Sequence, residues 1–309
     1  MDRIFAVLQV IAPIFVTVAL GVFARRKSIL TSDQMQGVQQ FVIKFCVPCV
    51  LFNSCYSANF TIESVASMAM VPPTLLAASI WSFKARKKTF PYHNLPILFA
   101  AQESGMLGIP LFLTLFGAAQ VYRIGVLDIA QSWIAIPVIA ILASKAESGA
   151  SPKEILKAVF SSPLMLMGLL GFILNLSGIA AWLDMIGIGS SITASTGFIA
   201  QPVSAAMLFS VGFNFSFDAK SRNEIIKISA IHFIAFAAVG LIMEGILMLL
   251  PDVAFETRIA VLLYMILPAS YLAPSLGRRE EEYAVASGVC SVLTAVTLIL
   301  FVAIAAIAR

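Results

Sequence analysis

Apolar residues in this sequence are grouped into long blocks that are separated by short polar or charged breaks. Each block is about 20 residues long, the length of α-helix that crosses about 30 Å of hydrocarbon. Nine breaks divide the chain into ten predicted membrane-spanning helices. These spans are 5–24, 36–55, 63–83, 94–116, 120–144, 160–178, 190–212, 225–249, 258–276 and 284–308. The pattern predicts an all-α, multi-pass membrane protein.

The composition supports a membrane location and excludes several other classes. Hydrophobic residues make up 60% of the chain and charged residues only 12%, whereas soluble domains carry about 25% charged residues. No basic cluster with interleaved aromatic residues indicates a nucleic-acid partner. The pair Cys46 and Cys49 has C-x-x-C spacing, but inside an apolar span it is interpreted as small packing residues. We therefore expect the lipid bilayer as the surroundings, and no metal or cofactor.

The distribution of Lys and Arg predicts how the chain is oriented. Fifteen of them lie in or beside the breaks after spans 1, 3, 5, 7 and 9, and four lie on the other side. The positive-inside rule then places both termini outside the cytosol, in a cell membrane. The first block, which is followed directly by Arg25, Arg26 and Lys27, is interpreted as a retained span. Within span 2, Lys44 either lines a cytosolic vestibule or, as we favour, extends to the interface.

Ten spans divide into two halves of five, predicted as residues 1–148 and 149–309. An odd number of spans in each half forces the halves to insert with opposite orientations. Traces of a duplication are visible, because Pro13 precedes Gly21 by eight residues in span 1, and Pro163 precedes Gly171 by eight in span 6. The sequence therefore predicts an inverted repeat, a plan that is common among secondary transporters.

Spans 4 and 9 hold corresponding positions in the two halves, and both carry helix-breaking residues. Span 4 contains Gly105, Gly108 and Pro110, and span 9 contains Pro268 and Pro274. Proline removes a backbone donor and clashes with the preceding turn, and the freed polar groups cannot face lipid. These positions are therefore predicted breaks that line a polar site near the bilayer midplane. The alternative is a pair of ordinary kinks.

Glu103 is the sharpest candidate for chemistry, because it lies within span 4 directly before the break. A carboxyl at this depth is energetically expensive and tends to mark a transport pathway or a proton relay. It could carry a proton, bind Na⁺, or simply join two helices. Helix N-termini at the breaks suit a carboxylate ligand. The predicted substrate contacts at the two breaks are Gln102, Glu103, Ser104, Gly105, Ser270 and Tyr271.

Four further polar residues lie within the other predicted spans. Gln131 in span 5 and Asn53 in span 2 are weaker candidates for substrate contact. Asp128 could pair with Arg123 nearer the outer surface, and a structural role is slightly favoured for it over a functional one. His232 in span 8 is interpreted as a packing residue rather than a proton relay. No motif of a hydrolase, a metalloprotease or a nucleotide-binding enzyme is present, so we do not expect an enzyme.

Several stretches together resemble the auxin efflux carrier family of transporters. They are IAPIFVTVALGVFARRKSIL, FCVPCVLFNSC, QESGMLGIPLFLTLFG, SSPLMLMGLLGFILNLSGI, AMLFSVGFNFS and LPASYLAPSLG. The family includes plant PIN-type auxin exporters and bacterial carriers of malonate, malate and similar anions. The short linker between the halves resembles the bacterial members. Glu103 stands where the PIN-type pattern has asparagine, which suggests a different coupling ion.

The resemblance implies a fold similar to that of the bile acid:sodium symporters, with a scaffold part, a transport part and two crossing broken helices. It implies elevator-type transport of a small organic anion, which would be a mono- or dicarboxylate or an auxin-like acid. We expect this transport to be linked to protons, with Glu103 as the proton site. A Na⁺-coupled symporter of the bile-acid type is the alternative, and a channel is less favoured. Many family members dimerise, which leaves a homodimer open. The direction of transport is not encoded in the sequence.

Overall fold

The computed structural model describes residues 2–58, 60–144, 163–216 and 219–308. Within these residues all regular structure is helical. The α-helices are α1 (Asp2–Arg26), α2 (Ser32–Phe41), α3 (Val47–Tyr56), α4 (Ile62–Lys88), α5 (Leu95–Ala100), α6 (Ile109–Phe116), α7 (Tyr122–Ser144), α9 (Pro163–Leu176), α10 (Ile179–Met185), α11 (Ile188–Ala200), α12 (Val203–Phe213), α13 (Arg222–Leu247), α14 (Phe255–Met265) and α15 (Glu280–Ala308). Shorter π-helical and 3₁₀ turns are η1 (Val42–Cys46), η2 (Ser104–Gly108), η3 (Ala118–Gln120) and η4 (Pro274–Leu276).

Seven helical stretches of the described residues are long and apolar enough to cross a membrane, and they match predicted spans 1, 2, 3, 5, 7, 8 and 10. Helix α9 falls in the region of span 6, and with α10, which begins just after the predicted end of that span, it forms a pair bent by 78° that would make an eighth crossing. The bend follows Gly178, whose φ of 76° suits glycine. Predicted spans 4 and 9 are not continuous helices. The prediction of an all-α, multi-pass protein is confirmed, and the predicted boundary at 148 lies outside the described residues.

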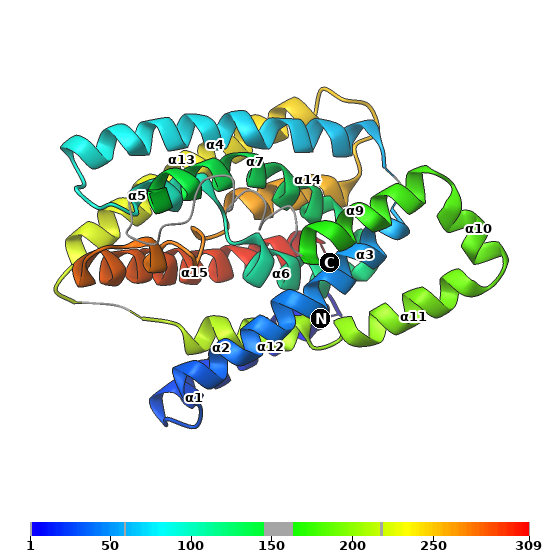
Figure 1. The fold of residues 1–309 in the computed structure, drawn as a ribbon, viewed down its shortest axis with the longest axis horizontal. Helices are drawn as coiled ribbons and strands as arrows, with labels where there is room; N and C mark the ends of the chain where they lie inside the picture. The colour runs from blue at the N-terminus through cyan, green and yellow to red at the C-terminus, as the bar shows by residue number, and fades with distance from the viewer. Residues whose placement is uncertain (1, 59, 145–162, 217–218, 309) are drawn as a thin grey trace.

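The helices form two groups that lie on opposite sides of the molecule in Figure 1. In one group α1 packs against α12, and α3 packs against α9 and α11. In the other, α4 packs against α5 and α7, and α13 packs against α14 and α15. We call the first set, which contains α1, α3, α9, α11 and α12, the α1–α12 group. We call the second set, which contains α4, α5, α7, α13, α14 and α15, the α4–α15 group. They meet where α12 contacts η2 and α6, and where α1 contacts α15.

The α1–α12 contact is closed by two glycines. A Cβ atom added at Gly21 would lie 2.0 Å from the carbonyl oxygen of Phe209, and one added at Gly212 would lie 1.9 Å from that of Val18. Neither position accepts a side chain without moving a helix backbone. Small residues of this kind let membrane helices approach closely, since burial from water contributes nothing between helices in lipid.

The contact between α9 and α3 has a similar construction. A Cβ atom added at Gly171 would lie 2.6 Å from the carbonyl oxygen of Phe52 and 3.1 Å from the amide nitrogen of Tyr56. Asn175, one turn further along α9, donates to the carbonyl oxygens of Tyr56 at 2.7 Å and Ala58 at 2.9 Å. These bonds satisfy carbonyls at the end of α3 that have no partner within the helix.

The two π-helical turns each lie just before a proline. η1 is followed by Pro48, and η2 by Pro110. Proline cannot donate to the preceding turn and its ring clashes there, so a widened turn accommodates it without ending the helix. In η2 this widening adjoins the break in predicted span 4, which places irregular backbone next to Glu103.

Candidate functional site

The two broken spans cross through extended backbone, and the crossing is held by main-chain hydrogen bonds. Gln102 and Ala269 form an antiparallel bridge. The amide of Glu103 donates to the carbonyl oxygen of Pro268 at 2.8 Å, and the amide of Ser270 donates to that of Ala101 at 3.0 Å. Each break thus satisfies polar backbone groups of the other, as a low-dielectric interior requires. We call residues 101–104 and 267–271 the crossover.

Glu103 lies at the centre of the crossover and is only 8% exposed. Its two carboxyl oxygens accept hydrogen bonds from backbone amides of both broken spans. Oε1 accepts from Met106 at 3.1 Å, at the start of η2, and Oε2 accepts from Tyr271 at 2.6 Å. A single side chain therefore joins the two segments, and any change in its charge is felt by both.

Gln102 lies beside Glu103 and is 2% exposed. When its amide is oriented to match its neighbours, its nitrogen donates to the carbonyl oxygens of Leu267 at 3.0 Å and Pro268 at 3.2 Å. Its backbone amide donates to Oε1 of Gln131 at 2.9 Å. The side chain therefore bridges the two breaks.

Gln131 and Asp128 reach the crossover from α7. Gln131 Oε1 also accepts from the Tyr264 hydroxyl at 2.8 Å, and its Nε2 donates to Asp128 Oδ1 at 2.5 Å and to Ser104 Oγ at 3.0 Å. The Ser104 hydroxyl in turn donates to Asp128 Oδ1. Gln131 thus lies at the predicted site, where both ends of its side-chain amide form hydrogen bonds with other residues of the protein.

The second break is supported by α15. The Tyr271 hydroxyl and Thr294 Oγ1 are 2.6 Å apart, and the Cys290 thiol lies 3.6 Å from the carbonyl oxygen of Ala269 and 3.7 Å from that of Ser270. Ser270 Oγ accepts from the amide of Leu272 at 3.3 Å. Both predicted polar residues of this break therefore lie at the crossover.

The predicted helix-breaking residues have separate local effects. A Cβ atom at Gly108 would lie 2.7 Å from Cδ1 of Leu267 in the other broken span, so glycine allows the close crossing. A Cβ atom added at Gly105 would have Glu103 Oε1 as its neighbour, at 4.0 Å. Pro110 is the second residue of α6, and Pro274 is the first residue of η4. Pro268 supplies the carbonyl to which Glu103 and Gln102 donate.

Asn53 lies apart from this cluster, on α3 in the α1–α12 group. Its Oδ1 accepts from Thr196 at 2.5 Å, and its Nδ2 donates to the carbonyl oxygen of Thr193 at 3.3 Å. Both partners belong to α11. The structure therefore brings together the other predicted contacts and leaves Asn53 as a bridge between two helices of its own group.

The expected pairing of Asp128 with Arg123 is wrong. Arg123 forms an ion pair with Glu63 at 2.7 Å and also donates to Thr257. Glu63 Oε2 accepts from the amide of Ala254 at 2.8 Å, so this cluster joins the starts of α4, α7 and α14. The five-residue spacing between Arg123 and Asp128 turns the two side chains toward different neighbours on the helix.

Tyr264, Thr294 and Cys290 were not identified from the sequence as parts of the site. Tyrosine, threonine and cysteine within an apolar span have no spacing that distinguishes a site from helix packing. Only the packing of α14 and α15 against the broken span brings them to the crossover. The four cysteines are all free and buried, which agrees with packing roles for Cys46 and Cys49.

Two polar residues of α13, His232 and Glu244, have their partners away from the crossover. His232 is 1% exposed and packs against the rings of Phe99 and Phe236, with centroid distances of 5.4 and 4.5 Å. This agrees with its interpretation as a packing residue. Glu244 forms an ion pair with Arg258 of α14.

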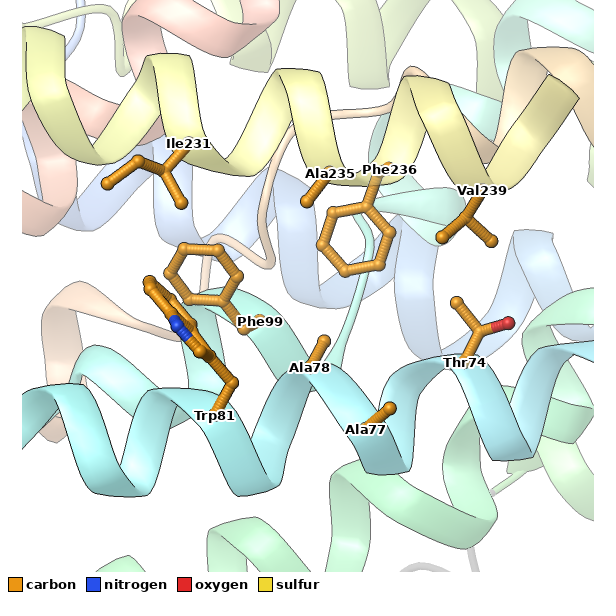
Figure 2. A pocket seen from close by; sticks show the side chains of 9 residues that line it. All are labelled: Thr74, Ala77, Ala78, Trp81, Phe99, Ile231, Ala235, Phe236 and Val239. Carbon is orange, nitrogen blue, oxygen red and sulfur yellow. The ribbon is translucent and has the colours of Figure 1, made fainter. Parts of the chain in front are cut away.

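A cavity of about 390 Å³ lies between α4 and α13 and is a poor candidate for a polar substrate. Figure 2 shows its lining, in which the rings of Trp81, Phe99 and Phe236 face aliphatic side chains. Thr74 also lines it, but its hydroxyl donates to the carbonyl oxygen of Met70 at 2.9 Å. Ligand sites need convergent polar groups to fix orientation, and these gather at the crossover instead.

At the sequence level the chain matches a family model described as membrane transport protein over residues 6–308. It therefore belongs to this family, and the resemblance to the auxin efflux carriers is confirmed. It is also similar to an uncharacterized transporter of Methanothermobacter thermautotrophicus, with 22% identity over 217 residues that cover 68% of each chain. The protein is thus a membrane transporter, because membrane transport is what this family is described by.

Proposed function

We propose that the protein is a secondary active transporter of a small organic anion, coupled to protons through Glu103. The anion would be a mono- or dicarboxylate or an auxin-like acid. The observation that carries this proposal is the position of Glu103, which accepts amides from both broken spans at their crossing. Binding of a proton to this one carboxyl would therefore change its hydrogen bonds to both broken spans.

The charge of the crossover supports coupling to a proton. An ionised Glu103 would repel an anionic substrate in a low-dielectric site, where interactions between charges are strong. Proton binding removes this repulsion and also weakens the two hydrogen bonds from Met106 and Tyr271. Backbone groups of the crossover could then bind the substrate. Gln102, Ser104, Gly105, Ser270 and Tyr271 remain our candidate contacts.

We infer an elevator-type movement from the division into two helix groups. The crossover is flanked by α5, η2 and α14, which contact α4, α7, α13 and α15, while η2 and α6 also contact α12 of the other group. In our proposal the α4–α15 group carries the crossover as the transport part. The α1–α12 group, closed by Gly21 and Gly212, stays fixed as the scaffold.

Equivalent contacts in the two halves support an inverted repeat of 1–148 and 149–309. Gly21 faces Phe209 and Phe213, and Gly171 faces Phe52 and Tyr56. Each pair of aromatic residues is four apart, and each glycine meets the second span of the other half. The repeat would supply ten crossings when the two broken spans are counted.

Polar bridges between α2–α3 and α11–α12 follow the same relation. Thr196 donates to Asn53 in one bridge, and Gln39 donates to Ser210 in the other. A separation of 157 residues relates both Asn53 to Ser210 and Gln39 to Thr196.

For the whole chain we keep the orientation with both termini outside the cytosol of a cell membrane. A homodimer stays a prediction.

Uptake into proteoliposomes tests this proposal. The purified protein would be assayed with labelled malonate, malate and an indole acid, each with a pH gradient, a Na⁺ gradient or neither. Accumulation driven by the pH gradient is the expected result. Saturation and counterflow would separate a carrier from a channel. The absence of flux for every acid under every condition would contradict the proposed substrate class.

A Na⁺-coupled symporter of the bile-acid type is the second candidate. The observation in its favour is the pair of oxygen atoms from Asp128 and Ser104 next to Glu103, because hard cations prefer oxygen ligands. Accumulation that requires a Na⁺ gradient and ignores the pH gradient would favour this mechanism.

A further inference from the structure

Asp128 lies on the neighbouring helix α7, and its side chain accepts hydrogen bonds from the side chains of Ser104 and Gln131 at the crossover. Its Oδ1 accepts from the Ser104 hydroxyl and from Gln131 Nε2. Its backbone carbonyl accepts from the Ser132 hydroxyl at 3.1 Å. Among the described residues the structure shows no ion pair for Asp128, and Arg123 of the same helix is bound to Glu63.

The hydroxyl of Ser104 has a single hydrogen, and Asp128 receives it. The Ser104 oxygen then accepts from Gln131 Nε2 at 3.0 Å. Ser104 directly follows Glu103, and its amide donates to the carbonyl oxygen of Gln102 at 3.0 Å. The bond from Ser104 to Asp128 therefore ties the residue next to Glu103 to α7.

Gln131 carries the same constraint to both broken spans. Its Oε1 accepts from the amide of Gln102 and from the hydroxyl of Tyr264, which uses both of its acceptor positions. Its Nε2 has two hydrogens for three acceptors, namely Asp128 Oδ1, Ser104 Oγ and the carbonyl oxygen of Gln102. When Asp128 is ionised, it is the strongest of these three acceptors.

We propose that Asp128 is a positioning residue of the crossover, which acts through Ser104 and Gln131 to hold Glu103 between the two broken spans. Asp128 does not contact the substrate in this proposal. The proposal rests on the proposed function for the role of Glu103, but the geometry that it describes can be tested without a substrate.

Asparagine at this position would have almost the same shape without the charge. A carboxylate inside a membrane protein is unfavourable unless it is neutralised or well paired. Replacing it by the amide removes that unfavourable charge and at the same time weakens the bonds to Ser104 and Gln131. We therefore expect Asp128→Asn to loosen the crossover while the melting temperature of the protein stays unchanged or rises.

Cys290 provides a readout of the crossover, since its thiol is 4% exposed and lies against the carbonyl oxygens of Ala269 and Ser270. Modification by N-ethylmaleimide in detergent would be followed at each cysteine by mass spectrometry. Cys55, 2% exposed in the α1–α12 group, is the internal reference. Asp128→Asn and Ser104→Ala should each raise the rate at Cys290 by about tenfold and leave Cys55 unchanged.

The double variant of Asp128→Asn and Ser104→Ala should be accelerated by less than the product of the two single effects, because both changes act on the bond between Asp128 and Ser104. Asp184→Asn is the matched control, since Asp184 accepts from the Tyr56 hydroxyl at 3.0 Å in the other helix group. It should leave the Cys290 rate unchanged.

Three results would overturn the proposal. They are an unchanged Cys290 rate in Asp128→Asn, equal acceleration at Cys290 and Cys55 with a lower melting temperature, and additive effects in the double variant. The first, accompanied by loss of Na⁺-driven uptake, would instead assign Asp128 to ion binding.

A kinetic measurement applies to any carboxylate that the unmodified protein transports. Asp128→Asn and Ser104→Ala should then each raise KM by about tenfold, and the double variant should raise it by less than the product of the two single effects. If the unmodified protein transports none of the acids, the proposed function fails. The thiol measurement still decides the role of Asp128.

Discussion

The contact between α1 and α12 and the crossover solve the same problem in opposite ways. Both must leave no backbone polar group facing lipid. Helices α1 and α12 keep their internal hydrogen bonds and approach closely at Gly21 and Gly212. The crossover opens both helices and satisfies the exposed groups with the other break and with side chains such as Gln131. The first contact resists rearrangement, whereas the second is held by polar groups whose bonds can be exchanged.

The largest expected effect is a side chain placed in the glycine contact. In Gly212→Leu the new Cβ atom would overlap the carbonyl oxygen of Val18 at 1.9 Å, so the helices must separate. We expect a loss of about 3 kcal/mol or more in the free energy of unfolding, measured by thermal denaturation in detergent. Gly37→Ala is the control, because no atom lies within 4 Å of its added Cβ. Equal stability of Gly212→Leu and the unmodified protein would contradict a tight contact.

Glu103→Gln should remove coupling at the crossover while the fold is kept. The amide cannot carry the proton, and only one of its two polar ends accepts hydrogen bonds from the amides of Met106 and Tyr271. Uptake in proteoliposomes should lose its response to a pH gradient. Glu281→Gln, at a side chain that is 57% exposed, should keep it. An unchanged pH response in Glu103→Gln would exclude Glu103 as the proton carrier.

Tyr264→Phe removes one hydrogen bond from the crossover and leaves its backbone pairing intact. Gln131 Oε1 then keeps only the amide of Gln102 as a donor. The loss of about 1 kcal/mol should lower the melting temperature by about 2–4 °C. Tyr283→Phe, at an exposed tyrosine, should change it little. The same melting temperature for both variants would show that the Tyr264 bond does not support the crossover.

His93 gives the smallest expected effect and lies outside both regions, in the loop between α4 and α5. Its ring is 3.2 Å from the carbonyl oxygen of Leu142, and burial lowers the pKa of its imidazole. The unfolded chain then binds a proton more readily than the folded one, so His93 should reduce stability as the pH falls below about 6.5. Melting temperatures at pH 7.5 and 5.5 should differ less in His93→Gln than in the unmodified protein. An equal difference would exclude His93 as a contributor.

Hydrophobic blocks predicted most of the helices because length and apolar composition together decide whether a segment can span the bilayer. Gly108, Pro110 and Pro268 also located the breaks, since their effect on the backbone is local. The partners of polar side chains were harder to predict. Asp128 was paired with Arg123 on its own helix, but it bonds to Ser104 of another segment. Asn53, equally polar in sequence, lies in the other helix group.

The sequence by itself determined a multi-pass helical transporter, two interrupted spans and one acidic residue at a break. These properties depend on hydropathy and on proline, glycine and charge at fixed positions. Only the tertiary structure decided that the two breaks pair with each other and that Tyr264 and Asp128 support them. The reason is that a side chain's hydrogen-bond partner is set by the helix packed beside it, and within an apolar span many neighbours fit the same sequence pattern.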